Sequence, residues 1–295
     1  MAHIVAIVNQ KGGVGKTTVC RTLASMLSQK GKKVLLIDMD AQQTLSTITG
    51  IMKDRFDEET PSIYHVLMNQ IPLKDAILHG EDFDFVKSDY RLYSYSGTPL
   101  LTKEQATSFQ GDPDGLYDFV MQNLRRQNDP MTDDRHKLRR ELDSVSEYYD
   151  FILLDTNPDL DAASVSVLLA APKTHVLIPA FPEESSRQAI IALYNTIQTI
   201  LENDLTQRIN ILGILISRFE RNNISKRYLS YLDATAKNMN TILFETLIPK
   251  SVLISESMAL KQTIFDRKKS APIIDEYWEF YNEFMERIAL SEKEN

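Results

Sequence analysis

Short apolar runs alternate with stretches of helical spacing along most of the chain. The runs that predict strands are Ile4–Val8, Val34–Ile37, Phe151–Leu154, His175–Ile178 and Ile209–Ile216. The stretches that predict helices are Thr18–Gln29, Ala163–Leu169, Arg187–Leu201 and Lys226–Lys237. Continuous β-branched runs separated by amphipathic helices are typical of buried parallel strands with crossover helices. We therefore expect an α/β fold, with a mostly parallel, doubly wound sheet flanked by helices and ligands bound beyond the carboxyl ends of its strands.

The stretch from Ile51 to Glu147 is less regular. It holds five prolines, and helical spacing is visible only near Gly115–Gln127 and Lys137–Ser146. We interpret it as an elaboration within a single domain that spans residues 1–295.

The C-terminal segment Ile273–Leu290 predicts one further helix. Its apolar positions fall along one stripe, formed by Ile274, Trp278, Tyr281, Phe284, Met285 and Ile288. The charged residues around this stripe are mainly acidic, whereas a helix that binds a membrane surface is normally basic. We expect this helix to pack on the protein's own surface.

The composition is that of an ordinary globular protein, with 43% hydrophobic and 25% charged residues among 295. The net charge of -8 excludes a generic DNA-coating protein but permits local basic patches. Cys20 is the single cysteine, which excludes an intrachain disulfide and a cluster that needs several cysteine ligands. No apolar run approaches the roughly 18 residues of a membrane span, and the first apolar run leads into Asn9-Gln10-Lys11, unlike a signal peptide. We expect a cytoplasmic protein.

A glycine-rich string, Lys11-Gly12-Gly13-Val14-Gly15-Lys16-Thr17-Thr18, follows the first predicted strand. Glycines let the backbone curl so that its N–H groups point at a phosphate chain, and the helix that follows adds its positive N-terminal dipole. This pattern predicts Lys16 at the β- and γ-phosphates and the Thr17 hydroxyl on Mg²⁺. The ordinary phosphate-loop pattern has glycine where Gln10 stands, and this chain has a second lysine instead, Lys11. The string has a chance frequency on the order of one in a million, which disfavours a turn without a ligand.

This string resembles the deviant Walker A motif of the ParA/MinD ATPases, in which the first lysine is called the signature lysine. Val34–Gln42 resembles the strand and switch I that follow in that family, and Tyr149–Pro158 resembles Walker B and switch II. Ile178–Glu183, Gly213–Arg221 and Glu245–Lys250 then follow the ParA/Soj branch in order. The resemblance covers nearly the whole chain and implies a deviant P-loop NTPase that uses ATP and Mg²⁺.

The chain also departs from the family pattern in both switches. Switch I has Ala41, Gln43 and Thr44 where ParA proteins usually have Pro, Gly and Asn. Switch II has Asn157 for the first of two prolines, and Ser166 stands where Asn is usual. These departures concern the rate of hydrolysis more than the binding of nucleotide.

Three aspartates at predicted strand ends are candidates for the metal and the chemistry. Asp155 follows the strand Phe151–Leu154, so its carboxylate is placed to hold Mg²⁺ through the ion's water shell. Asp38 and Asp40 end the second strand, and their parity predicts that one faces the nucleotide and the other the strand edge. The resemblance implies that Asp40 orients the attacking water and that Lys11 and Lys16 are the other catalytic residues. Asp38 supports the magnesium site or has a structural role.

Lys11 and Pro249 each have two interpretations. In the family the signature lysine crosses to the nucleotide of a second subunit, so that two facing ATP molecules are neutralised and dimerisation depends on the γ-phosphate. The alternative for Lys11 is an exposed lysine that touches the phosphates of its own subunit. Pro249 follows the strand-like Ile242–Leu247 and either touches the adenine or simply ends the strand.

Partition ATPases of this type bind DNA without sequence preference as ATP dimers, so the resemblance directs attention to basic residues. The candidates are Arg218, Arg221, Lys226, Arg227, Lys250, Arg267, Lys268 and Lys269. The alternative for the first four is a solvated helix face, which is also our interpretation of a second basic run, Arg135–Arg140. Because the glycine-rich loop begins at Lys11, we expect no helix-turn-helix domain ahead of it.

The leading hypothesis is a ParA-type partition ATPase that associates with the nucleoid, with a ParB-like centromere-binding partner. No arginine finger is evident in the motifs, so we expect slow turnover that the partner stimulates.

The alternative, a MinD-like membrane-positioning ATPase, would require a basic amphipathic C-terminal helix. A nitrogenase-iron-protein-like reductase needs paired cysteines, which a chain with only Cys20 lacks. A metabolic P-loop ligase shares the fold but would not form a substrate-independent ATP dimer.

Overall fold

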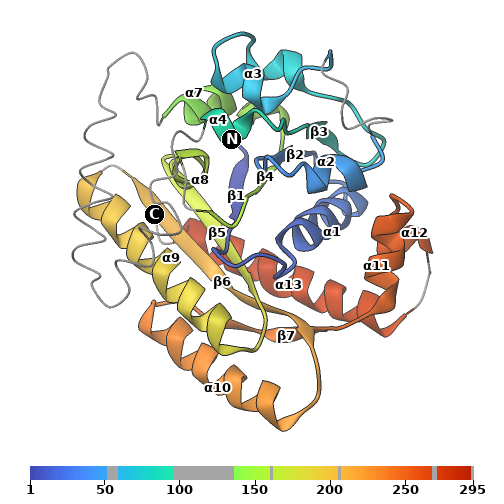
Figure 1. Cartoon of the computed structure of the whole chain (residues 1–295), viewed down its shortest axis with the longest axis vertical. Coiled ribbons are helices and arrows are strands. Elements are labelled where there is room, and N and C mark those ends of the chain that lie inside the picture. Colours follow the sequence, from blue (N-terminus) through green and yellow to red (C-terminus); the bar gives the residue numbers. More distant parts are fainter. Residues whose placement is uncertain (52–58, 96–135, 160–161, 205–206, 268–270, 294–295) are drawn as a thin grey trace.

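A seven-stranded sheet in the order β3-β2-β4-β1-β5-β6-β7 forms the centre of the molecule, and every pairing between these strands is parallel (Figure 1). The computed structural model describes residues 1–51, 59–95, 136–159, 162–204, 207–267 and 271–293. The strands are β1 (His3–Ile7), β2 (Val34–Asp38), β3 (Asp84–Val86), β4 (Phe151–Asp155), β5 (Lys173–Ala180), β6 (Arg208–Phe219) and β7 (Leu243–Pro249). The predicted α/β fold with a parallel, doubly wound sheet is confirmed.

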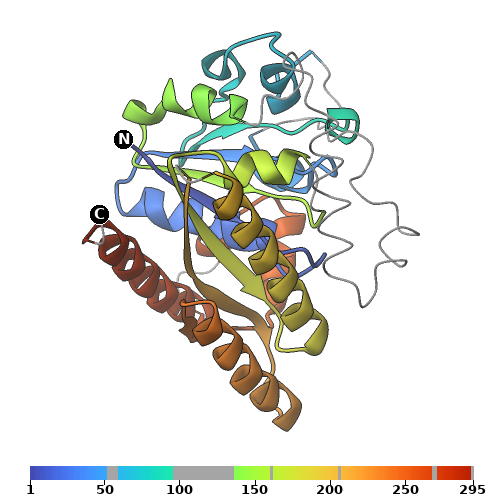
Figure 2. The same ribbon diagram turned by 90° about the vertical axis from the view of Figure 1, so that its left-hand side faces the viewer.

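Helices cover both faces of the sheet (Figures 1 and 2). One face carries α1 (Lys16–Gln29), α2 (Thr44–Ile48), α11 (Val252–Ala259), α12 (Ile264–Arg267) and α13 (Pro272–Lys293). The other carries α3 (Ile63–Leu67), α4 (Leu92–Tyr95), α7 (Lys137–Asp143), α8 (Ala162–Leu168), α9 (Glu184–Asn203) and α10 (Asn223–Asn238). Short 3₁₀ turns, η1 (Leu73–Ala76) and η2 (Ser146–Tyr148), lie in the irregular part of the chain.

Successive residues of the central strands are buried on opposite faces of the sheet. In β1, Ile4 and Ala6 pack into the core under α7 to α10, while Val5 and Ile7 pack into the core under α1 and α13. A strand covered on both faces needs apolar residues at every position, because its side chains alternate between two cores. The continuous apolar runs of the sequence follow from this arrangement.

The less regular stretch contributes one strand that the sequence pattern did not predict. β3 is only three residues long and pairs with β2 at the edge of the sheet. Three residues are too few to carry a recognisable period. The helix expected near Gly115–Gln127 lies outside the described residues, and the one expected at Lys137–Ser146 ends at Asp143.

The C-terminal helix α13 packs along the sheet beside β7 and α1 (Figure 2). Its buried side chains are Ile273, Ile274, Tyr277, Phe280, Tyr281, Phe284 and Ile288. Trp278 and Met285, also part of the expected stripe, are partly buried against the same core. The apolar side of α13 is therefore occupied by the protein itself.

Glu283 of α13 satisfies backbone groups of the edge strand β7. The pairing of β6 with β7 shifts register between Leu243 and Leu247, so the residues between them bulge. The Glu283 carboxylate accepts hydrogen bonds from the backbone N–H of Glu245 at 2.8 Å and of Thr246 at 2.9 Å. The helix thus covers an edge that would otherwise present unpaired donors.

We predict that Glu283→Gln lowers the free energy of unfolding by about 1–3 kcal/mol, because an amide cannot accept from both N–H groups and one is left unsatisfied. Urea denaturation of the purified protein measures the change. Glu286→Gln, on the exposed side of the same helix, is the control and should have little effect. Equal stabilities for the two variants would contradict this account of β7.

Candidate nucleotide-binding site

The glycine-rich loop joins β1 to α1 at the carboxyl edge of the sheet. Gly13 and Gly15 have φ values of 76° and 91°, in the left-handed region that glycine adopts without strain. No atom lies within 4 Å of the position that a Cβ would take at Gly12 or Gly13, so the loop borders open space there. Ser217 of β6 supports it from below by donating a hydrogen bond to the Val14 carbonyl at 2.7 Å. This is the shape of a phosphate cradle.

Lys16 begins α1 and bends back over the loop. Its side chain is buried, and its Nζ donates to the carbonyls of Asn9 at 3.0 Å and Lys11 at 3.3 Å. Burial lowers the pKa of Lys16, and the nearby carboxylates of Asp155 and Asp40 act in the opposite direction. A phosphate chain in the loop would meet this ammonium group directly.

Asn9 fixes the start of the loop. Its amide nitrogen donates to the Pro179 carbonyl of β5 at 2.7 Å, and its side-chain oxygen accepts from the Lys11 N–H at 2.9 Å.

Asp38 and Asp155 are aligned neighbours at the ends of β2 and β4, and both are completely buried. Asp38 accepts from the Ser46 N–H at 2.8 Å, the Ser46 hydroxyl at 2.7 Å and the Asp40 N–H at 3.0 Å. Burial raises the pKa of Asp38 to about 7 against these hydrogen bonds. These hydrogen bonds tie both oxygens of Asp38 to switch I, and its two expected roles, structural or in support of the magnesium site, stay predictions.

Asp155 differs from Asp38 in the contacts of its carboxylate. Neither of its carboxylate oxygens has a hydrogen-bond partner of good geometry in the described part of the chain. Burial first, and then the charge of Asp38, raise the pKa of Asp155, while the nearby Thr17 hydroxyl and Lys16 lower it. An orphaned buried carboxylate beside a threonine hydroxyl and a phosphate loop fits Mg²⁺, which binds hard oxygen ligands and retains waters. The described residues hold no group of three or more His, Cys, Asp or Glu that could hold a metal alone, so most ligands would come from phosphate and water.

Asp40 lies two residues beyond Asp38 and is half-buried. Its carboxylate accepts from the Gln42 N–H at 2.9 Å, and its carbonyl accepts from the Gln43 N–H at 2.8 Å. The Asp40 charge acts on both Lys16 and Asp155, which places it beside the cradle. Gln43, where ParA proteins usually have Gly, has φ 56° and so keeps a left-handed conformation.

Lys11 reaches the turn between β5 and α9. Its Nζ forms an ion pair with Glu183, donates to the Ser185 hydroxyl at 2.6 Å and lies 5.9 Å from the centre of the Phe181 ring. Arg218, at the end of β6, stacks on the same ring at 4.9 Å. The signature lysine therefore has a binding place on its own chain, about 170 residues away in the sequence.

The structure brings most of the basic candidates to one end of the molecule. Arg218, Arg221, Lys226 and Arg227 lie exposed between the end of β6 and the first turns of α10. Lys250, just after β7, is joined to this group through an ion pair with Glu220 at 2.9 Å.

Other basic residues lie apart from that group. Arg267 ends α12 and pairs with Glu256 of α11 at 3.0 Å, while Lys268 and Lys269 lie outside the described residues. The second basic run is not a uniformly solvated helix, because Lys137 is buried and donates to Asn69. Arg135 lies outside the described residues.

Pro249 is half-buried at the end of β7, opposite Phe219 of β6 and at the carboxyl edge of the same sheet as the loop.

The sequence pattern did not predict four residues that contact the loop or Asp38: Ser46, Ser217, Glu183 and Ser185. The contacts of Ser217, Glu183 and Ser185 to the loop depend on strand order, which no local pattern carries, whereas Ser46 reaches Asp38 from α2, which follows the same strand. Within the described ranges, no helix has the length and apolar character of a membrane span.

A family model described as an AAA domain matches residues 2–211, well over half of the chain. The chain belongs to the AAA domain family. The chromosome partitioning protein ParA of Myxococcus xanthus is 29% identical over 257 residues, covering 87% of this chain and 78% of the relative. The chromosome-partitioning ATPase Soj of Thermus thermophilus is 27% identical over 285 residues, covering 96% of each. These relatives confirm a ParA/Soj-type member of the ParA/MinD superfamily.

Solved structures support the fold. A putative plasmid partition protein from Borrelia burgdorferi, solved bound to AMPPNP, superposes with a TM-score of 0.70 at 22% identity. The match covers 99% of this chain and 100% of that protein. The shared architecture extends beyond residue 211 to the C-terminal helices.

We predict that Asp155→Asn raises the melting temperature of the nucleotide-free protein, because it replaces a buried carboxyl group, whose charged form is disfavoured by burial and by Asp38, with a neutral amide. A gain of 1 kcal/mol corresponds to about 2–4 °C in a protein of this size. The same variant should lose most of the stabilisation that Mg²⁺ with an ATP analogue gives the wild type. Thermal unfolding with and without the nucleotide measures both, and an unchanged nucleotide response would contradict the role of Asp155.

Proposed function

We propose that this protein is a partition ATPase whose ATP-bound dimer binds double-stranded DNA without sequence preference and is released when a ParB-like partner stimulates hydrolysis. The observation that carries the proposal is the orphaned carboxylate of Asp155 beneath a phosphate cradle that holds Lys16 and Thr17. The partition proteins among its relatives support the same function. Such a protein would act in the cytoplasm, on the nucleoid.

The proposed chemistry divides between the loop and the two switches. Backbone N–H groups of the loop and the Lys16 ammonium hold the phosphates, and Thr17 with Asp155 would hold Mg²⁺, which neutralises phosphate charge when bound. Asp40 acts on Lys16 electrostatically and would orient a water toward the γ-phosphate. Asp38 holds switch I in place through Ser46.

Lys11 provides the proposed link between ATP and dimerisation. On its own chain it lies at Glu183 and Ser185, away from the carbonyl contacts that hold Lys16 in the loop. In the proposed dimer it exchanges Glu183 for the phosphates of the facing subunit, and this exchange is favourable only where a triphosphate supplies the negative charge. Hydrolysis then weakens the interface, so the lifetime of the dimer depends on the time that ATP remains unhydrolysed.

We predict that Lys11→Ala remains monomeric with a slowly hydrolysed ATP analogue, whereas the wild type shifts to a dimer in size-exclusion chromatography. The physical reason is the loss of the charge that neutralises the facing phosphates. Lys33→Ala, an exposed lysine before β2, is the matched control and should dimerise as the wild type does. A wild type that stays monomeric with every nucleotide would refute the proposed dimer switch.

DNA affinity would follow from dimerisation without any change in the basic residues. Each neutralised phosphate contributes about 0.9 to the slope of log affinity against log salt. A monomer with three or four contacts binds weakly at cellular salt, and a dimer that presents both sets on one surface roughly doubles the slope.

We predict that a Lys226→Ala, Arg227→Ala double variant still dimerises with ATP but binds DNA with a salt slope lower by up to about 3–4, because two contacts per subunit are lost. Fluorescence anisotropy with a labelled duplex at several salt concentrations measures the slope. Lys237→Ala, at the other end of α10 and paired with Asp233 at 2.6 Å, is the control. An unchanged slope in the double variant would exclude this surface as the DNA site.

The alternative, a MinD-like membrane-positioning ATPase, receives less support. The apolar side of α13 is buried in the core, and the exposed positions of the helix include Asp275, Glu279 and Glu286. A helix of this kind has neither the free apolar face nor the basic charge that membrane binding requires. Flotation with liposomes in the presence of ATP distinguishes the two functions.

A further inference from the structure

Switch I, here residues 38–46, is fastened by a neighbouring loop that follows β3. Within this β3 loop (residues 87–93, which include the start of α4), the Ser88 hydroxyl donates to the Asp40 carbonyl at 2.7 Å. The Ser88 N–H donates to the Ser46 hydroxyl at 3.0 Å, and Ser46 in turn donates to Asp38. One residue of the β3 loop therefore contacts both ends of switch I.

Ser88 is completely buried; its contact to Ser46 is buried as well, and its contact to Asp40 is partly buried. A buried carbonyl or hydroxyl that loses its donor is left unsatisfied, so these bonds are costly to break. A third contact, from the Gln42 side chain to the Tyr93 hydroxyl, joins the exposed part of switch I to the same loop.

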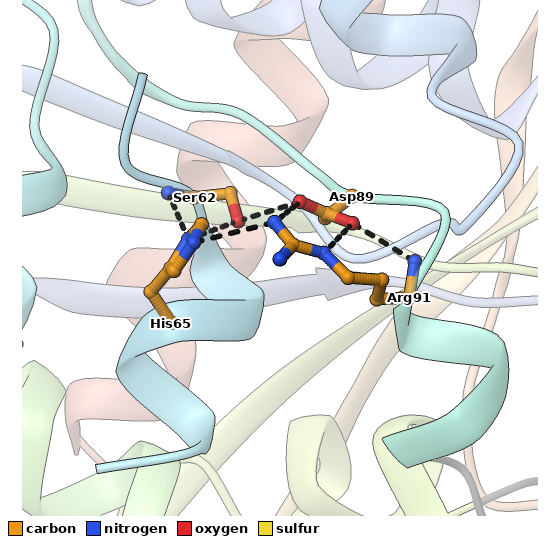
Figure 3. A network of polar contacts seen from close by, with 4 residues as sticks. All are labelled: Ser62, His65, Asp89 and Arg91. Carbon is orange, nitrogen blue, oxygen red and sulfur yellow. Dashed lines mark hydrogen bonds and ion pairs between the residues drawn. The ribbon is translucent and has the colours of Figure 1, made fainter. Parts of the chain in front are cut away.

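A polar cluster, which we call the clasp, holds the β3 loop itself (Figure 3). It consists of Ser62, His65, Asp89 and Arg91. The guanidinium of Arg91 donates to both oxygens of Asp89, from Nε at 2.8 Å and from Nη2 at 2.6 Å, and the Arg91 N–H donates to the same carboxylate at 2.9 Å. Asp89 is only 4% exposed, while the Arg91 side chain is 30% exposed, so this bidentate pair is partly buried.

The clasp is tied to α3 through its other two members. Arg91 Nη2 lies 3.2 Å from His65 Nε2, and the Ser62 hydroxyl lies 2.9 Å from His65 Nδ1 and 3.3 Å from an Asp89 oxygen. The Ser62 N–H donates to His65 Nδ1 at 3.1 Å, which closes a capping box at the start of α3, and the Ser62 hydroxyl donates to Asp89. The β3 loop is thereby anchored to the N-terminus of α3.

Switch I needs such an anchor in this chain. Gln43 has φ 56°, a conformation that glycine adopts freely and that costs a residue with a side chain free energy. The strained backbone persists only where surrounding contacts hold it, and the contacts from Ser88 to Asp40 and Ser46 lie on both sides of Gln43.

We propose that the clasp is a positioning device for switch I, which acts through Ser88 to set the place of the Asp40 carboxylate. The inference rests on the proposed function, in which Asp40 orients the attacking water. None of the clasp residues touches the phosphate loop in the described contacts. Ser88 and Arg91 are thus positioning residues, and their loss displaces Asp40 without altering the cradle.

Hydrogen–deuterium exchange tests the positioning directly, without any need for activity. In Ser88→Ala and in Arg91→Lys we expect a peptide covering residues 38–49 to exchange at least tenfold faster than in the wild type. Lysine keeps the charge at position 91 but lacks the planar fork, and Arg91 is part-exposed, so the fold tolerates this change. Ser144→Ala, an exposed serine that also donates to a backbone carbonyl, is the control and should not change this peptide.

Unchanged exchange of residues 38–49 in both variants overturns the inference. A change in Ser88→Ala alone overturns the part assigned to the clasp. Faster exchange of the β4 peptide as well would indicate general unfolding and count against a positioning role.

Kinetics then tests the consequence for the proposed reaction. We expect kcat for ATP hydrolysis to fall about 10- to 100-fold in Ser88→Ala with KM near the wild-type value, since misplacement of about 1 Å costs on this scale. A rise in KM at unchanged kcat would overturn the positioning role. If the wild type hydrolyses no ATP, the proposed function fails, while the exchange experiment still decides the inference about the clasp.

Discussion

The crowding of buried carboxylates at the carboxyl edge of the sheet is the constraint on which the rest of the site depends. Parallel pairing of β2 with β4 places Asp38 directly beside Asp155, and neither is exposed. Ser46 donates two hydrogen bonds to Asp38, whereas the contacts that lower the pKa of Asp155, from the Thr17 hydroxyl and Lys16, are outweighed by burial and by Asp38. Lys16 alone does not balance the carboxylates around it, so the site favours an added cation. In the proposed function, binding of nucleotide with Mg²⁺ would supply that cation.

Features that depend on local sequence were predictable, and those that depend on strand order were not. The central strands follow from continuous apolar runs, and the phosphate loop follows from one string between Lys11 and Thr18. The pairing of Lys11 with Glu183 joins residues far apart in the sequence, and the burial of Lys137 depends on the packing of α7 against α3 and α8. β3 is too short to carry a period, yet the loop after it holds Ser88 against switch I.

The departures of switch I and switch II from the family pattern change residues more than geometry. Gln43 retains the left-handed backbone that a glycine would supply, and Asn157 finds a partner in the Ser164 hydroxyl at 2.8 Å. Neither residue belongs to the loop that cradles phosphate. That these substitutions concern the rate of hydrolysis more than the binding of nucleotide stays a prediction.

The turn between β5 and α9 is where the proposed dimer switch and the proposed DNA surface meet. Lys11 and Arg218 lie over one ring, that of Phe181, and Glu183 is the carboxylate that balances the lysine there. When Lys11 leaves for a facing nucleotide in the proposed dimer, Arg218 would lose a neighbouring cation and Glu183 would keep only the hydroxyl of Ser185, which donates to it at 3.0 Å. A single contact would thereby couple the nucleotide state to the charge balance at the start of the basic surface, without a long chain of rearrangements between the two.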